Sequence, residues 1–250
     1  MISLAGRRVL ITGGSRGIGA ATALLCARAG ADVGITYHTR RSDAERVARS
    51  IRALGRRVFV GGGDLGDPNR VSQLFAELKA AFGGLDGFVA NHGIWPPAET
   101  PLASLAPERW RETLRTNLDA VFFATRAALG LMPDGGRVVL VGSTAGQRGE
   151  AFHADYAASK GAIMSLVKSL AMECAPTVTV NCVAPGWVDT EMSAQPYVGE
   201  GRARIAAAIP MQRIASADDI AGPILFLLSD LARHITGEVL NVNGGSVLCG

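Results

Sequence analysis

Near its start the chain carries the stretch Thr12-Gly13-Gly14-Ser15-Arg16-Gly17-Ile18-Gly19, which joins an apolar run, Val9–Thr12, to a segment of helical period, Gly17–Ala29. Glycines let the backbone turn tightly and approach a pyrophosphate, and the first turn of a helix offers free N–H groups to an anion. The spacing is Gly-x-x-x-Gly-x-Gly, not the Gly-x-Gly-x-x-Gly of the usual dinucleotide fingerprint. The alternative is an ordinary turn, but the position between the first strand and the first helix favours phosphate binding.

Beyond this loop, apolar strand-like runs alternate with helix-like segments. Strands that are apolar on both faces and separated by helices predict a parallel sheet covered on both sides, and right-handed crossovers make it doubly wound. We expect one α/β domain over residues 1–250 with about seven parallel strands, and a lid over the binding site in the irregular stretch 186–210. The expected strands are 9–12, 32–37, 57–60, 85–90, 137–141, 178–183 and 239–242, and the expected helices are 17–29, 42–54, 69–82, 107–132, 156–174 and 216–229.

Composition excludes several classes of protein. The 250 residues are 48% hydrophobic, too apolar for a disordered chain. The formal net charge of +3 is scattered rather than gathered in a basic stripe, so we expect no nucleic-acid partner. No apolar run reaches about 18 residues, which argues against a membrane span. The four cysteines have neither zinc-site spacing nor a disulfide framework, so we expect a cytoplasmic protein without a metal.

A second motif is Tyr156-Ala157-Ala158-Ser159-Lys160. Four residues make about one helical turn, so Tyr156 and Lys160 share a helix face. A phenol with a reference pKa of about 10 needs a nearby cation to act as an acid or base near neutrality, and a lysine one turn away supplies one. The alternative is an ordinary surface pair, but a chain that also carries the glycine loop favours catalysis.

With these motifs in hand, the chain resembles the short-chain dehydrogenase/reductase family over nearly its whole length. Within the family it is most similar to the 3-oxoacyl-acyl-carrier-protein reductase branch, through Ile209-Pro210-Met211-Gln212-Arg213 and the Ile-Thr-Gly-Glu tail. The resemblance implies a Rossmann fold. It rests on the glycine loop, Asp64-Leu65, Asn91-His92-Gly93, Asn117, Gly142-Ser143, Tyr156, Lys160, Pro185-Gly186 and residues 236–245.

The resemblance also implies a catalytic tetrad. Tyr156 would exchange a proton with the carbonyl or alcohol oxygen, and Ser143 would hydrogen-bond that oxygen. Lys160 would lower the pKa of the tyrosine and bind the nicotinamide ribose, while Asn117 would hold a water linking Lys160 to solvent. The alternatives are a turn serine at Ser143 and a core amide satisfied by the backbone at Asn117.

The same resemblance implies the cofactor contacts. Asp64 would accept from the adenine amino group, Asn91 would support the ribose and nearby backbone, and Val188 and Thr190 would hold the carboxamide. The full expected set is Gly13, Ser15, Arg16, Gly17, Ile18, Gly19, His38, Thr39, Arg40, Asp64, Leu65, Asn91, Gly93, Tyr156, Lys160, Pro185, Gly186, Val188 and Thr190. The chain departs from the family pattern at Ala90 and His92, and for His92 we favour a structural role over a catalytic one.

The segment Thr36-Tyr37-His38-Thr39-Arg40-Arg41-Ser42 bears on the choice of cofactor. An enzyme that uses NAD usually has an acid here for the ribose 2′-hydroxyl, whereas an arginine accommodates the 2′-phosphate of NADP. No acid lies between Asp32 and Asp43, and Arg16, Arg40 and Arg41 are candidate phosphate partners. The alternative is a solvated arginine pair. The sequence therefore predicts NADP, with NAD still possible.

We expect an NADP-dependent oxidoreductase that interconverts a carbonyl and a secondary alcohol, in a form similar to a 3-oxoacyl reductase. The alternatives are a sugar or polyol dehydrogenase and a regulatory nucleotide-binding protein without activity. Relatives pair the two helices at 107–132 and 154–174 between subunits, so we expect a homotetramer. The candidates for the substrate pocket are mostly apolar and favour an acyl chain, a steroid or a polyketide: Trp95, Gln147, Phe152, His153, Trp187, Met192 and Tyr197.

Overall fold

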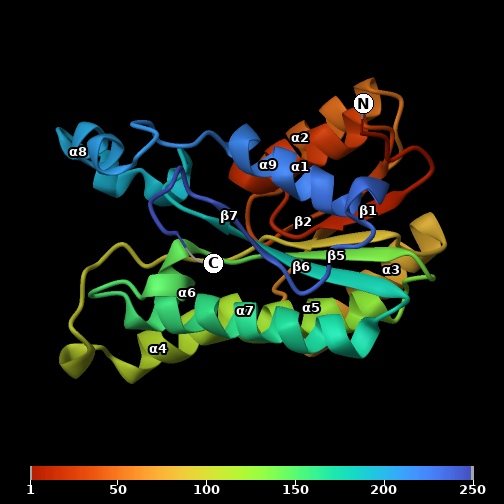
Figure 1. The fold of residues 1–250 in the computed structure, drawn as a ribbon. Helices are drawn as coiled ribbons and strands as arrows, with labels where there is room; N and C mark the ends of the chain where they lie inside the picture. The colour runs from red at the N-terminus through yellow and green to blue at the C-terminus, as the bar shows by residue number, and fades with distance from the viewer. Residues whose placement is uncertain (1, 249–250) are drawn as a thin grey trace.

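Seven parallel strands in the order β3-β2-β1-β4-β5-β6-β7 form the centre of the computed structural model, which describes residues 2–248 (Figure 1). Side chains alternate between the two faces of a strand, so Leu10 packs with one helical layer and Val9 and Ile11 with the other. The strands are β1 (Arg8–Ile11), β2 (Asp32–Tyr37), β3 (Val58–Gly62), β4 (Gly87–Ala90), β5 (Gly136–Val141), β6 (Val178–Pro185) and β7 (Val239–Val242). This arrangement confirms the doubly wound parallel sheet expected from the sequence.

Helices cover both faces of the sheet (Figure 1). One layer contains α1 (Gly17–Arg28), α2 (Arg41–Ala53) and α9 (Ala217–Leu228), and the other contains α3 (Pro68–Phe82), α4 (Pro107–Leu114), α5 (Ala120–Leu129) and α7 (Ala154–Cys174). Each layer builds its own apolar core against the sheet. Shorter turns lie in the connections: η1 (Leu102–Ser104), α6 (Thr144–Arg148) and η5 (Asp230–Ala232).

The expected single helix over 107–132 is interrupted. Between α4 and α5 lies η2 (Arg115–Asp119), a π-helical turn that contains the buried Asn117, and α5 ends at Leu129. A π turn has i→i+5 hydrogen bonds and no composition signal of its own, so the apolar pattern over 107–132 did not reveal it. Such turns are frequent at functional sites because they re-aim a side chain.

The stretch 186–210, expected to be irregular, is partly helical. It contains η3 (Glu191–Ser193), η4 (Gln195–Tyr197) and α8 (Gly201–Ala208). α8 contains several alanines and arginines, which are strong helix formers, but none of its residues is buried. Without an apolar stripe this helix has no periodic signature in the sequence.

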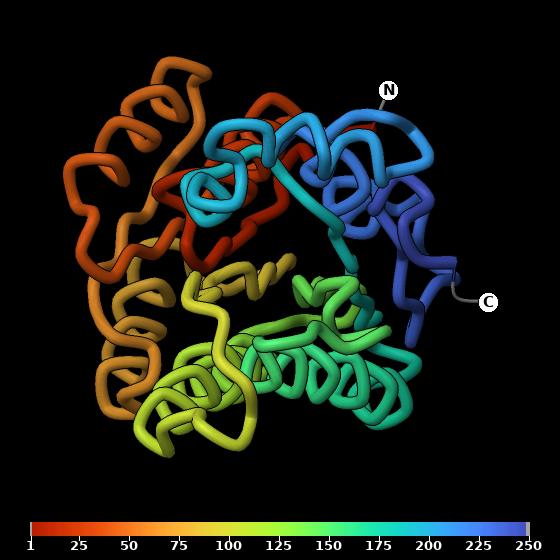
Figure 2. The backbone as a smooth tube through the Cα atoms, turned by 90° about the vertical axis from the view of Figure 1, so that its left-hand side faces the viewer, coloured from red at the N-terminus to blue at the C-terminus, as the bar shows by residue number. Residues whose placement is uncertain are grey.

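The strand order reverses between β1 and β4, which both pair in parallel with their neighbours. Ligands of such sheets bind at this switch point, beyond the carboxyl ends of the strands. Figure 2 looks onto that end, from which the loop after β4 (yellow) and the segment after β6 (cyan to light blue) emerge. No helix within residues 2–248 is long and apolar enough to cross a membrane.

Candidate active site

The glycine loop leaves the start of α1 open. Gly13 adopts a φ of +65°, and a Cβ at Gly19 would lie 2.2 Å from the carbonyl oxygen of Gly13, so both positions require glycine. The amide of Asn91 donates to the carbonyl oxygens of Thr12 at 3.1 Å and Gly13 at 3.3 Å. Arg16, at the N-cap of α1, makes no side-chain capping bond, so the first N–H groups of the helix remain available to an anion.

A cavity of about 490 Å³ extends from this loop to α7. Two expected residues do not line it: Gly19 lies against the loop backbone, and Asn117 is fully buried. The expected residues that line it are Gly13, Ser15, Arg16, Gly17, Ile18, His38, Thr39, Arg40, Asp64, Leu65, Asn91, Gly93, Ser143, Tyr156, Lys160, Pro185, Gly186, Val188 and Thr190. Segments distant in the sequence therefore meet in one cavity.

Ser143, Tyr156 and Lys160, which we call the catalytic group, lie together in this cavity. Ser143 follows β5 and caps α6, where its hydroxyl oxygen accepts from the N–H of Ala145 at 3.1 Å. Lys160 Nζ donates to the carbonyl oxygen of Val141 at 2.9 Å and lies 5.8 Å from the centre of the Tyr156 ring. The helical spacing of the motif thus places both side chains as the sequence predicts.

Burial dominates the protonation of the catalytic group. It raises the pKa of Tyr156 to about 12, with Ser143 acting in the opposite direction through a hydrogen bond and the charge of Glu150 adding to the rise. Burial also lowers the pKa of Lys160 to about 8. Lys160 is not among the groups that shift the pKa of Tyr156, so the expected lowering of that pKa by Lys160 is not found. The phenol is protonated at neutral pH and can donate.

Asn117 holds a loop rather than facing the cavity. Its carbonyl oxygen accepts from the N–H of Ile94 at 2.7 Å, and its amide donates to the carbonyl oxygen of Ile94 at 2.9 Å and to Ser159 Oγ at 3.1 Å. These bonds match the alternative of an amide satisfied mainly by the backbone. The π turn thereby fixes the loop after β4 beside Lys160, and the water relay through Asn117 stays a prediction.

Asp64 is already engaged by the protein. One carboxylate oxygen accepts from the N–H of Gly66 at 2.8 Å and the other from the guanidinium of Arg115. Burial raises the pKa of Asp64, but these two donors outweigh burial and lower it overall. The predicted bond to adenine would therefore share a carboxylate that Arg115 holds, and no feature of the sequence around Arg115 indicated this pair.

His92 is buried beside the loop, with Nδ1 2.7 Å from Thr12 Oγ1. Burial first, and then the charge of Lys160, lower its pKa to about 4, so the ring is neutral near pH 7. This tie to Thr12, the residue that follows β1, supports the structural role favoured from the sequence. Among residues 2–248 no group of His, Cys, Asp and Glu could hold a metal ion, and Cys249 lies outside the described residues.

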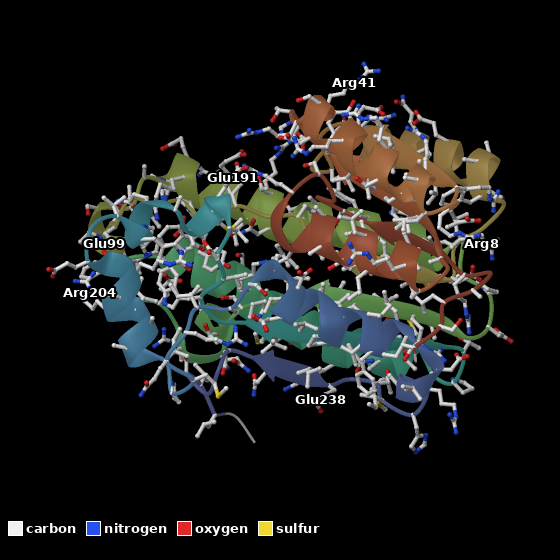
Figure 3. The ribbon with its side chains drawn as sticks, turned by 90° about the horizontal axis from the view of Figure 1, so that it is seen from above. Arg8, Arg41, Glu99, Glu191, Arg204 and Glu238 are labelled. Carbon is white, nitrogen blue, oxygen red and sulfur yellow. The ribbon has the colours of Figure 1, made fainter. Side chains whose placement is uncertain are left out.

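Two of the expected phosphate partners are bound to a carboxylate that sequence reasoning missed. Arg16 pairs with Glu191 Oε2, and Arg40 Nη2 lies 3.4 Å from the same oxygen. We call Arg16, Arg40 and Glu191 the arginine rim. All three side chains are about half exposed, and Figure 3 shows Glu191 between Arg41 of α2 and the side of the molecule that carries Glu99 and Arg204. Glu191 follows Thr190 directly, the only signal in the sequence that it would reach the cavity.

A second cavity of about 800 Å³ adjoins the first, and the two share Trp95, Glu150 and Trp187. Of the pocket candidates, Trp95, His153, Trp187 and Met192 line one or both cavities. Three others line neither. Gln147 bonds to Asn241, Phe152 is half exposed, and the hydroxyl of Tyr197 donates to the carbonyl oxygen of Val188. Sequence reasoning overlooked Glu150, although it lies only six residues before Tyr156.

Known proteins resemble the chain over almost its full length. The family model described as Enoyl-(Acyl carrier protein) reductase matches residues 13–246. The 3-oxoacyl-acyl-carrier-protein reductase FabG of Escherichia coli (strain K12) is 37% identical over 96% of this chain and 97% of its own length. Versicolorin reductase 1 of Aspergillus parasiticus is 36% identical, with 97% of both chains covered.

The solved structures agree with the sequence comparisons. A short-chain dehydrogenase from Burkholderia cenocepacia J2315 in complex with NADP is 39% identical and superposes with a TM-score of 0.91, covering 97% of this chain and 98% of that chain. Identity at this level over the whole length, together with the shared fold, shows common descent and confirms the resemblance inferred from the motifs. The chain belongs to the short-chain dehydrogenase/reductase family.

Proposed function

We propose that the protein reduces a ketone to a secondary alcohol with NADPH, and that Tyr156 donates the proton. The observation that carries this proposal is the position of the catalytic group in the same cavity as the open N-terminus of α1. The expected class, an oxidoreductase acting on carbonyl and alcohol groups, is confirmed by the family and its relatives. The expected dependence on NADP is confirmed by the relative solved with NADP bound.

The residues present fit NADP. The uncapped N-terminus of α1 suits a pyrophosphate, since its N–H groups and its dipole favour an anion. Arg16 and Arg40 both contact one oxygen of Glu191, so their guanidinium groups converge on a single anionic position. A 2′-phosphate is an anion of this kind, and guanidinium binds phosphate with strong, charge-assisted hydrogen bonds.

When bound in this cavity, NADPH would supply the hydride for the carbonyl carbon of the substrate. Tyr156 donates its phenolic proton to the carbonyl oxygen, and the Ser143 hydroxyl donates a hydrogen bond to the same oxygen. Lys160, held by the carbonyl oxygen of Val141, places its positive charge near the phenolate that forms. Val188 and Thr190, which line the cavity, would hold the carboxamide of the nicotinamide, and Asn117 keeps the loop after β4 in place.

The test is an activity profile over a panel of ketones and alcohols with NADPH and NADH. We expect reduction of ketones with an apolar body, with NADPH preferred. A protein that binds NADPH but turns over no member of the panel would favour the alternative of a regulatory protein. Within enzymes, a sugar or polyol dehydrogenase is the second candidate, favoured by polar side chains of the outer cavity such as Glu99, Gln195 and Arg204.

We also propose a homotetramer. Phe122 on α5 is 47% exposed and Met172 on α7 is 83% exposed, on the helical layer expected to pair between subunits. β7 lies at an edge of the sheet, which offers a second contact. Light scattering at micromolar concentration should give four times the monomer mass, whereas a monomer mass would refute the assembly.

We further propose that the segment 186–210 acts as a lid over the binding site. We also propose that the protein works in the cytoplasm, where the free thiols of Cys26, Cys174 and Cys182 stay reduced.

A further inference from the structure

Glu150 lies where the two cavities meet. It belongs to the turn between α6 and α7, and its side chain is 22% exposed. Its negative charge contributes to the raised pKa of Tyr156, so the carboxylate acts electrostatically on the phenol. A substrate whose carbonyl reaches Tyr156 and whose body extends into the outer cavity passes this side chain.

The two oxygens of Glu150 differ in their partners. Oε1 accepts from the indole N–H of Trp95 at 3.1 Å and lies 3.7 Å from Nδ1 of His153. Trp95 stacks on His153 with the ring centres 4.6 Å apart, and one ring nitrogen of each faces Oε1. Oε2 accepts from no residue within 2–248, and it is not among the polar atoms sealed in the interior without a partner. Oε2 is therefore an accessible, unused acceptor.

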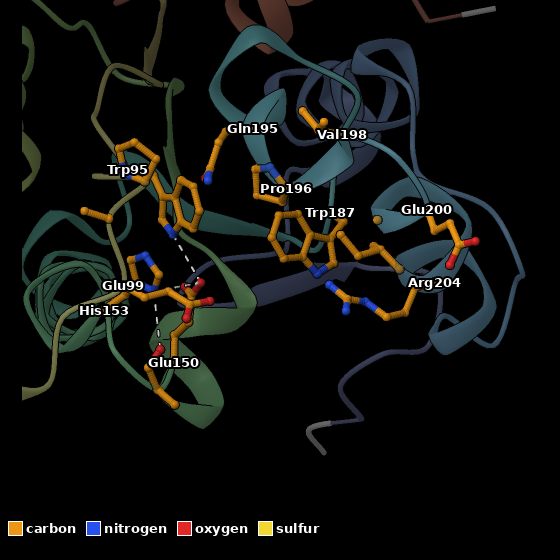
Figure 4. Close-up of a pocket in the computed structure, with 15 residues that line it drawn as sticks. Trp95, Glu99, Glu150, His153, Trp187, Gln195, Pro196, Val198, Glu200 and Arg204 are labelled. Atoms are coloured by element: carbon orange, nitrogen blue, oxygen red, sulfur yellow. Dashed lines mark hydrogen bonds and ion pairs between the residues drawn. The ribbon is translucent and has the colours of Figure 1, made fainter.

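The walls around this acceptor are flat and apolar. Trp95 and Trp187 meet edge to face, with ring centres 6.2 Å apart. In Figure 4, Glu150 and His153 lie on the Trp95 side of the pocket, and Arg204 lies on the far side with Glu200. The outer cavity also contains Glu99, so carboxylates outnumber the arginine. This balance of charge disfavours an anionic substrate and favours one that can donate to a carboxylate.

We propose that Glu150 is a specificity-determining residue that accepts a hydrogen bond from a hydroxyl or ammonium group on a ring-bearing ketone. The proposal rests on the proposed ketone reductase function and names its substrate class. A ketone without such a donor leaves Oε2 unpaired beside the aromatic walls, and a ketone that carries a carboxylate meets repulsion. Glu150 thereby selects for the substrate body, while Tyr156 and Ser143 act on the carbonyl.

The test compares four bicyclic aryl ketones of one skeleton: the parent and its hydroxy, amino and carboxy derivatives. Glu150→Gln keeps an oxygen for the indole of Trp95 but places an amide NH₂, which cannot accept, in the position of Oε2. A hydrogen bond to a charged group is worth about 1.5–3 kcal/mol. The ratio of kcat/KM for the best donor-bearing ketone to kcat/KM for the parent ketone should therefore be roughly 10- to 150-fold lower in Glu150→Gln than in the wild type. The hydroxy and amino compounds distinguish a neutral donor from a cationic one. Glu108→Gln, on the exposed surface of α4 and lining neither cavity, is the matched control and should keep the wild-type ratio.

Binding provides a second readout that does not depend on turnover. Quenching of tryptophan fluorescence gives the affinity of each ketone for the protein saturated with NADP⁺. Tighter binding of a donor-bearing ketone by the wild type but not by Glu150→Gln supports the proposal, even if no ketone is reduced, in which case the proposed function alone fails. Equal affinity for all four ketones overturns the proposal. An equal loss of kcat/KM on all of them also overturns it, because Glu150 would then act only through Tyr156 or Trp95.

Discussion

Lys160 and Arg40 line the same cavity, yet Lys160 is only 5% exposed whereas the Arg40 side chain is 54% exposed. Burial lowers the pKa of Lys160 and raises that of Tyr156 beside it. The arginine rim instead forms ion pairs in contact with water, where screening keeps each pair weak. The properties of the catalytic group thus depend on exclusion of water, whereas the arginine rim consists of exposed ion pairs. Substitutions in the catalytic group should therefore have larger effects on activity than substitutions in the rim have on cofactor binding.

The largest effect is expected from Tyr156→Phe. The change removes the phenolic proton donor from the catalytic group, and positioned acid catalysis contributes about 10²–10⁴-fold to rate. Turnover measured with a reactive ketone should fall by that order while NADPH still binds. A near-normal kcat in this variant would contradict the mechanism.

The next effect concerns His92, a buried group of the cavity wall. Its pKa is about 4 in the folded protein against a reference value of 6.5, so the unfolded chain binds the proton more tightly. His92 therefore contributes about 3 kcal/mol to the free energy of unfolding. This contribution is complete above pH 6.5 and is lost as pH falls through the pKa of the folded state. His92→Ala should flatten this acid limb in denaturant titrations at several pH values. An unchanged slope between pH 6.5 and 4 would show that His92 does not carry it.

A smaller effect is expected at the rim from Arg40→Ala. A hydrogen bond to a charged group corresponds to roughly 10- to 150-fold in affinity, and the half-exposed side chain places Arg40 near the lower end. Fluorescence titration should show weaker NADPH binding and nearly unchanged NADH binding, with added salt acting mainly on NADPH. Equal weakening of both cofactors would rule out a contact with the 2′-phosphate.

The smallest effect is expected from Glu191→Gln, and its sign is opposite. Glu191 holds both rim arginines and must release them to a phosphate, so its neutralisation should tighten NADPH binding. Exposed pairs contribute about 0.2–1 kcal/mol, which corresponds to at most about fivefold. The ratio of the NADH and NADPH dissociation constants should rise. A fall in that ratio would mean that Glu191 supports the cofactor rather than competing with it.

Local patterns in the sequence determined the order of strands and helices, the glycine loop at the start of α1, and the shared face of Tyr156 and Lys160. Each of these depends on residues within a few positions of one another, because helix and strand periods and turn chemistry are local properties. The family resemblance added Ser143 and the segment after β6, which the structure brings to the same cavity.

Only the tertiary structure decided which charges meet. Arg16 and Arg40 are separated from Glu191 by 175 and 151 positions, and Asp64 from Arg115 by 51. No local period encodes such pairs, since they arise from where the crossovers bring the loops. The same holds for the π turn that aims Asn117 at the loop after β4, and for the protonation of Tyr156 and Lys160. Burial controls both pKa values, and burial is a property of the whole fold.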